Sequence, residues 1–135
     1  MEKTVEIGGI PCRLKTNAGL PRVYRLLVGG DIFEDIEIMR RTLAALLASM
    51  TDKNKKPPTQ EEQDRAVTVT ENVAFAMHKL GDPTQPNTVE QWLEQFEDEA
   101  ALANSGVIGE LLSLWYHETE TTAEEKKKKD QSSGE

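Results

Sequence analysis

The first fifteen residues alternate between apolar and polar side chains, which is the period of a β-strand. A Gly-Gly pair at residues 8 and 9 divides the alternation into two halves and supplies a turn. We therefore predict a β-hairpin over residues 3–15. Because a two-stranded ribbon is only marginally stable alone, one face of this hairpin should lie on the segments that follow. The apolar positions of the two halves are Val5, Ile7, Ile10, Cys12 and Leu14.

The rest of the pattern up to residue 116 has the three-to-four-residue period of amphipathic helices. The first helix is capped by Thr16 or Asn17 and ends at the pair Gly29-Gly30. The second begins at Asp31, with Glu34 completing an acidic capping box, and its regular apolar stripe runs to Met50, which predicts packing within a bundle. The stripe consists of Ile32, Ile36, Met39, Leu43, Leu46 and Met50.

Three more helices are predicted beyond a Pro-containing loop at residues 52–60. Thr59 and Glu62 form a capping box for the third, which ends at Gly81. Thr88 caps the fourth, which continues to Ala100, and a fifth runs over residues 107–116.

These elements give an α+β fold that is mostly α: an N-terminal β-hairpin packed on a bundle of about five helices. Residues 1–117 form a single domain in this prediction. Hydrophobic residues nearly vanish after residue 117, so residues 118–135 are predicted to be a disordered, acidic and lysine-rich tail.

Charge then limits the possible partners, since 24 acidic residues oppose 16 basic ones. Between Lys79 and Lys126 there is no Lys or Arg, and such a surface repels a phosphate backbone, so no nucleic-acid partner is expected. No apolar run is long enough to cross a bilayer, and the N-terminus lacks a secretory pattern. Together with the single Cys12, these features predict a cytoplasmic protein without a membrane partner.

No pattern of catalytic or metal-ligating residues stands out. His78 and His117 each lack a second ligand at metal-binding spacing and are interpreted as surface or helix-end histidines. Cys12, on an alternating strand, is interpreted as a small core residue. We therefore expect no enzyme, no catalytic residue, no metal and no cofactor. A cleft that assembles distant acids remains the alternative that would make the chain an enzyme.

Binding of other proteins is the remaining function class. Both tryptophans fall on the last two predicted helices, where their side chains form either the core or a binding groove. The candidate partner-binding residues are Trp92, Leu93, Phe96, Leu112, Trp115 and Tyr116.

The order of these segments resembles the tail assembly chaperones of long-tailed bacteriophages and prophages of Gram-positive-type hosts. The resemblance begins with TNAGLPRVYRLLVGGDIFEDI at residues 16–36 and resumes with ENVAFAMHKLGDP at residues 71–83. It continues through VEQWLEQFEDE at residues 89–99 to Leu114-Trp115 and a lysine-rich end. Each motif alone also obeys general helix rules, so the order of the motifs carries the resemblance. The loop at residues 52–60 and the pair Leu27-Val28 depart from the family's pattern and leave the subgroup open.

The resemblance implies binding without catalysis. Such chaperones bind the tape measure protein, keep it soluble and help to recruit tail tube protein subunits, and they are absent from the mature virion. Self-association is possible within this interpretation. The family also implies a longer product made by ribosomal frameshifting, for which the run Lys126, Lys127, Lys128 and Lys129 is either the encoded slippery stretch or a solvated charge run. The alternative function is a small acidic helical adaptor or regulatory protein with a cellular partner.

Overall fold

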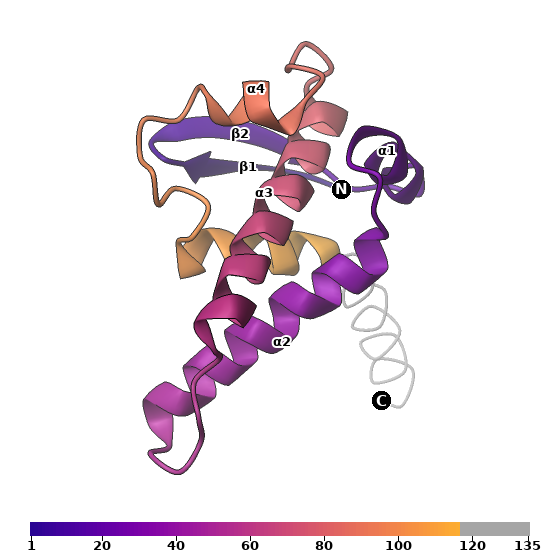
Figure 1. Ribbon diagram of the computed structural model, residues 1–135. Coiled ribbons are helices and arrows are strands. Elements are labelled where there is room, and N and C mark those ends of the chain that lie inside the picture. Colours follow the sequence, from indigo (N-terminus) through magenta and orange to yellow (C-terminus); the bar gives the residue numbers. More distant parts are fainter. Residues whose placement is uncertain (117–135) are drawn as a thin grey trace, which may run out of the picture.

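The computed structural model describes residues 1–116 and places an N-terminal hairpin against a set of helices (Figure 1). The strands are β1 (Glu2–Ile7) and β2 (Ile10–Lys15). The helices are α1 (Leu20–Leu27), α2 (Ile32–Thr51), α3 (Gln60–Gly81), α4 (Val89–Leu93) and a fifth helix at residues 105–116. This confirms the predicted α+β class. The predicted tail at residues 118–135, with Lys126–Lys129, lies outside the described residues.

The hairpin forms where the alternation predicts it. β1 and β2 pair antiparallel from Glu2 opposite Lys15 to Ile7 opposite Ile10, so only Gly8 and Gly9 make the turn. Both glycines have positive φ angles, of 57° and 82°, which is the backbone that a tight two-residue hairpin requires. The apolar side chains of one face, among them Cys12, are buried against the helices.

α3 is the central element of the body. Its residues from Val73 to His78 are all buried, because the hairpin, α1, α2 and α4 pack around its C-terminal half. Thr59 and Glu62 form the predicted capping box, with Thr59 Oγ1 accepting from the Glu62 N–H at 3.1 Å. The predicted extent of this helix, from its cap at Thr59 to Gly81, is confirmed.

α1 starts later than its predicted cap. The N-cap residue is Gly19, and Asn17 instead accepts a hydrogen bond from the Gly19 N–H at 2.9 Å. The side chain of Asn17 therefore closes the turn that precedes the helix, and Thr16 is buried. The end of α1 follows the prediction, because Gly29 takes a positive φ of 87° just after Val28.

The fourth predicted helix, expected to reach Ala100, is only five residues long. After Leu93 the Gln95 side chain donates to the Trp92 carbonyl oxygen at 2.9 Å, and the Asp98 side chain accepts from the Ala100 N–H at 2.9 Å. Such local side-chain bonds give the backbone an alternative to the helical ladder. Turns therefore replace the helix until residue 105.

One buried cluster extends from Val5 to Leu114 and joins the hairpin to all the helices. None of the helices within residues 1–116 combines the length and the apolar character needed to cross a membrane.

Candidate partner-binding surfaces

Trp92 is a core residue. Its side chain is fully buried, and its indole Nε1–H donates to His78 Nδ1 at 2.9 Å. The ring also lies 5.9 Å from Phe75 and 4.9 Å from Phe96, measured between centroids. Through these contacts Trp92 fixes α4 to the last turns of α3. Of the two alternatives given by the sequence, the core position holds for Trp92.

His78 lies near the end of α3 as predicted, but it is buried and not on the surface. Because its Nδ1 accepts the bond from Trp92, the neutral ring must carry its proton on Nε2. Burial lowers the pKa of His78, and the nearby Asp82 carboxylate opposes this shift. A buried indole N–H needs a hydrogen-bond acceptor, and His78 provides it. The sequence alone does not reveal that these two side chains meet.

Trp115 and Tyr116 belong to a different surface. Trp115 packs edge-to-face on Phe33 with ring centroids 5.4 Å apart, and Phe33 itself is 62% exposed. These three aromatic side chains and Pro21 line a shallow hollow of about 550 Å³. Thr16 also lines it, and the buried hydroxyl of Thr16 has no hydrogen-bond partner among the described residues.

The structure therefore divides the six predicted partner-binding residues into two groups. Trp92, with half-buried Leu93 and Phe96, lies at the C-terminal end of α3. Trp115 and Tyr116 lie beside the start of α2. Leu112 is half-buried on the same helix as Trp115. No single groove contains all six.

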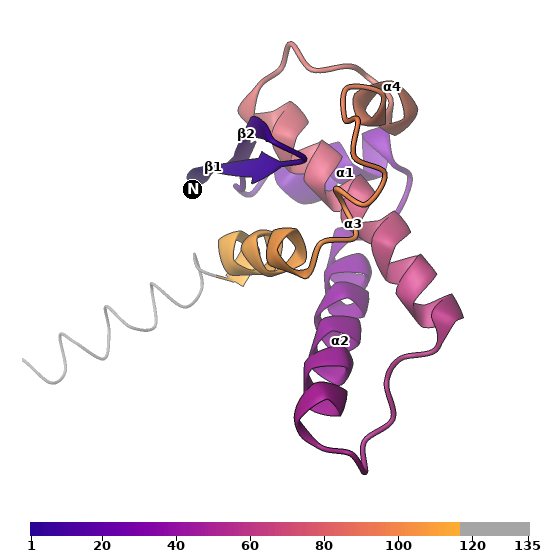
Figure 2. The ribbon, with the colours of Figure 1, turned by 90° about the vertical axis from the view of Figure 1, so that its left-hand side faces the viewer.

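A stronger candidate is the part of the molecule that projects from the body, which we call the arm (residues 42–67). It consists of the second half of α2, the connecting loop and the first turns of α3, and Figure 2 shows it extending away from the hairpin and α4. The apolar stripe of α2 continues into the arm but loses its cover there. Met39 is 1% exposed, whereas Leu47 is 51% and Met50 75% exposed. Of the predicted stripe, Leu43 and Leu46 are half-buried, so the prediction that the whole stripe packs within a bundle is wrong at its last residue, Met50.

Part of this stripe lines a groove between α2, α3 and the 105–116 helix, and we call this groove the arm groove. Its volume is about 270 Å³, and mainly apolar side chains of α2 form its floor. α3 forms one wall, and the start of the 105–116 helix closes the end next to the body. The residues that line it include Leu43, Leu46, Gln63, Asp64, Val67 and Ile108.

The part of the arm that belongs to α2, residues 42–51, differs from the rest of the chain in charge. No charged residue occurs in residues 42–51, although 30% of all residues are charged. On α3, Asp64 lines the groove beside this neutral strip, and Glu61 and Glu62 lie in the first turn of the same helix. Lys53, Lys55 and Lys56 lie in the loop between α2 and α3. An exposed half-helix that is apolar and uncharged typically marks an interaction surface. The absence of charged residues at 42–51 is visible in the sequence. It does not by itself indicate an interaction surface, because the regular apolar spacing of α2 predicts a helix buried along its whole length.

Chemistry-bearing groups elsewhere have structural roles. Cys12 is fully buried, and burial raises the pKa of its thiol to about 11. Within residues 1–116 there is no group of three or more His, Cys, Asp and Glu side chains that could hold a metal ion. Comparison of the chain with protein-family models, with curated proteins and with solved structures gives no significant match.

Proposed function

We propose that this protein is a tail assembly chaperone of a long-tailed bacteriophage or prophage, which binds the helical tape measure protein through the arm groove. The observation that carries the proposal is the exposed apolar surface of α2 in the arm: Leu47 and Met50 are exposed, and they follow along the same helix the groove-lining Leu43 and Leu46. The order of sequence motifs described above supports the choice of family.

The shape of the arm suits a helix as the bound partner. An amphipathic helix that lies in a groove buries side chains spaced by three and four residues, and Leu43, Leu46, Leu47 and Met50 offer the same spacing on the receiving side. A long helical protein whose apolar face is still uncovered would otherwise aggregate. The acidic border along α3 favours a partner with basic residues beside that face.

The test is co-expression with the long helical protein encoded next to this chain, measuring how much of that protein stays soluble and co-purifies. Wild-type chain should keep it soluble. The double variant Leu47→Glu/Met50→Glu should lose this effect, because two carboxylates would be buried unpaired in the contact. Both positions are exposed, so the variant should fold normally.

Leu26→Glu is the matched control, since Leu26 is 76% exposed on α1, outside the arm. It should retain full capture. Capture by the double variant at the wild-type level would refute the arm as the binding site. If the wild-type chain itself fails to bind or solubilise the neighbour, the adaptor interpretation replaces the chaperone. A longer frameshifted product is a separate prediction, checked by mass spectrometry of the expressed products.

A further inference from the structure

The outer edge of β1 carries unused backbone hydrogen-bonding groups. Met1 and Thr16 face each other and exchange two backbone hydrogen bonds, of 2.7 and 2.8 Å. From this pair onward, hydrogen-bonded residue pairs alternate with non-hydrogen-bonded pairs along the two strands. Lys3, Val5 and Ile7 therefore turn their N–H and C=O groups toward β2. Those of Glu2, Thr4 and Glu6 turn away from it, and no hydrogen bond within residues 1–116 uses them. This edge is the template for one more strand.

The outer edge of β2 is closed by two features. Pro11 stands opposite Glu6, at an outward-facing position, and has no N–H to offer. The outward carbonyl of Arg13 is covered by the end of α3, where a Cβ added at Gly81 would overlap the Arg13 oxygen. Only one side of the hairpin can therefore accept a strand.

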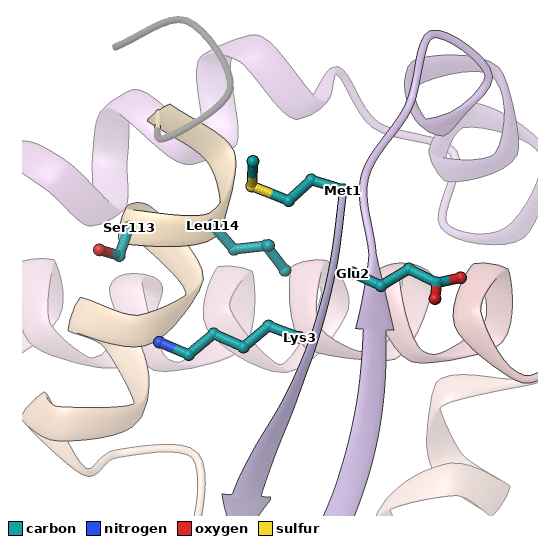
Figure 3. Close-up of a pocket in the computed structure, with 5 residues that line it drawn as sticks. All are labelled: Met1, Glu2, Lys3, Ser113 and Leu114. Carbon is teal, nitrogen blue, oxygen red and sulfur yellow. The ribbon is translucent and has the colours of Figure 1, made fainter. Parts of the chain in front are cut away.

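A channel runs along the open edge, between β1 and the 105–116 helix. One end is a hollow of about 430 Å³ in which the side chains of Met1, Lys3 and Leu114 lie between the strand and the helix (Figure 3). The other end is a hollow of about 370 Å³ lined by Thr4, Glu6 and Val107, among others.

The ion pair between Lys3 and Glu110 crosses the channel between its two hollows. Both side chains are more than 40% exposed, so the pair can open at little cost. On the helix, the small residues Gly106 and Ser113 flank Glu110 and line the two hollows. Small side chains at these positions leave room for a backbone to approach.

We propose that the β1 edge binds an extended, basic segment of another protein as a third strand of the sheet. Only an extended backbone presents N–H and C=O groups at the spacing of Glu2, Thr4 and Glu6. Glu2 already forms ion pairs with Arg13 and Lys15, so the charge preference comes from Glu6: a side chain of the segment on the solvent face beside Glu6 is favoured as lysine or arginine and disfavoured as a carboxylate. Apolar side chains at the alternate positions meet Met1 and Leu114.

Two other occupants fit the channel less well. A second copy paired antiparallel about Thr4 would place Glu2 opposite Glu6 twice, which sets like charges together. The segment 117–135 of this chain contains no large apolar residue to meet Met1 and Leu114. The proposed segment therefore belongs to a different protein, and this binding does not depend on the arm groove.

The experiment is NMR-detected amide exchange and titration with a synthetic seven-residue peptide that alternates valine and lysine. In the free protein, the amides of Thr4 and Glu6 should exchange at least about ten-fold faster than those of Val5 and Ile7. Saturating peptide should remove this difference. A peptide N-methylated at the bonding amides, and one with glutamate in place of lysine, should each bind at least about ten-fold more weakly.

Thr4→Pro is the variant that tests the edge itself, because it removes one outward N–H. Pro11 shows that this hairpin tolerates proline at an outward position, so the fold should persist, as checked by the thermal unfolding midpoint. Peptide binding should disappear. Glu110→Ala removes the crossing ion pair and should strengthen binding by up to about five-fold.

Three results would overturn the proposal: no binding at millimolar peptide, equal binding by Thr4→Pro, or equal binding of the N-methylated peptide. Protection of the Thr4 and Glu6 amides in the free protein that rises with protein concentration would assign the edge to a second copy instead.

Discussion

The buried position of His78, where it accepts the bond from Trp92, makes the stability of the fold depend on pH as the pH falls through about 6.5. The unfolded chain takes up a proton at His78 near pH 6.5. In the folded protein the pKa of His78 lies lower, chiefly because the ring is buried. The unfolded state therefore binds more protons as the pH falls through 6.5. The stabilisation is complete above pH 6.5 and is lost progressively toward the folded pKa.

The size of this pH effect follows from the uptake of one proton by His78 on unfolding. Between the unfolded and folded pKa values of His78 the free energy of unfolding should fall by up to about 1.4 kcal/mol per pH unit. For a domain of this size that lowers the unfolding midpoint by about 5 °C per unit. Glu2, Glu37 and Glu62 have pKa values below their usual range and Asp82 has one of about 2, so these four carboxylates titrate below the range in which His78 acts. Burial raises the pKa of Glu71, which opposes the effect of His78 at the acidic end of the range.

Urea unfolding followed by circular dichroism at pH 7.5, 6.5 and 5.5 measures this dependence. His78→Phe is the key comparison. It leaves the Trp92 N–H without an acceptor and should cost about 1–3 kcal/mol at pH 7.5. The same variant should lose this pH dependence. His117→Gln, which removes the other histidine, should keep the wild-type slope. A flat wild-type profile, or a slope that survives in His78→Phe, would refute the reasoning.

Three further outcomes are expected from local features. Cys12 should react with a thiol reagent at pH 8 only after unfolding in urea, because it is buried and its pKa is raised to about 11; rapid reaction of the native protein would contradict this. Gly81→Ala should destabilise by about 1–3 kcal/mol, because its Cβ overlaps the carbonyl of Arg13, as measured by urea titration. Gly109→Ala is the matched control: its Cβ meets open space, so helix propensity should raise stability by up to about 1 kcal/mol. Thr59→Ala should cost about 1 kcal/mol by loss of the cap, and an unchanged urea midpoint would count against the capping geometry.

Features specified by neighbouring residues were predictable from the sequence. The turn at Gly8-Gly9 requires positive φ angles that glycine adopts easily, and the cap at Thr59 is completed by a residue three positions away. In both cases the determinant and the structure lie within one turn of chain, so no knowledge of the tertiary fold is needed.

The length of α4 was not predictable in this way. Its apolar spacing continues past Leu93, but Gln95 and Asp98 take up backbone groups that a longer helix would use. Likewise, nothing near Trp92 in the sequence shows that its indole meets His78, fourteen residues earlier. Long-range packing decides both features.

The candidate sites show the same limit. The period of α2 correctly gives the apolar face, and the uncharged run at residues 42–51 is visible in the sequence. Where the body ends along that helix depends on the 105–116 helix, which is distant in sequence. The closed outer edge of β2 depends in turn on α3 covering Arg13, a contact that no local pattern encodes.

The closed edge of β2 also has a consequence for aggregation. Fibrils of the cross-β kind grow because every added strand presents a fresh edge to the next, so a growing stack needs a template that is open on both sides. In this hairpin Pro11 and the end of α3 block one side permanently. Intact folded copies can therefore join edge to edge only as pairs, and the hairpin cannot seed an indefinite stack while α3 remains in place.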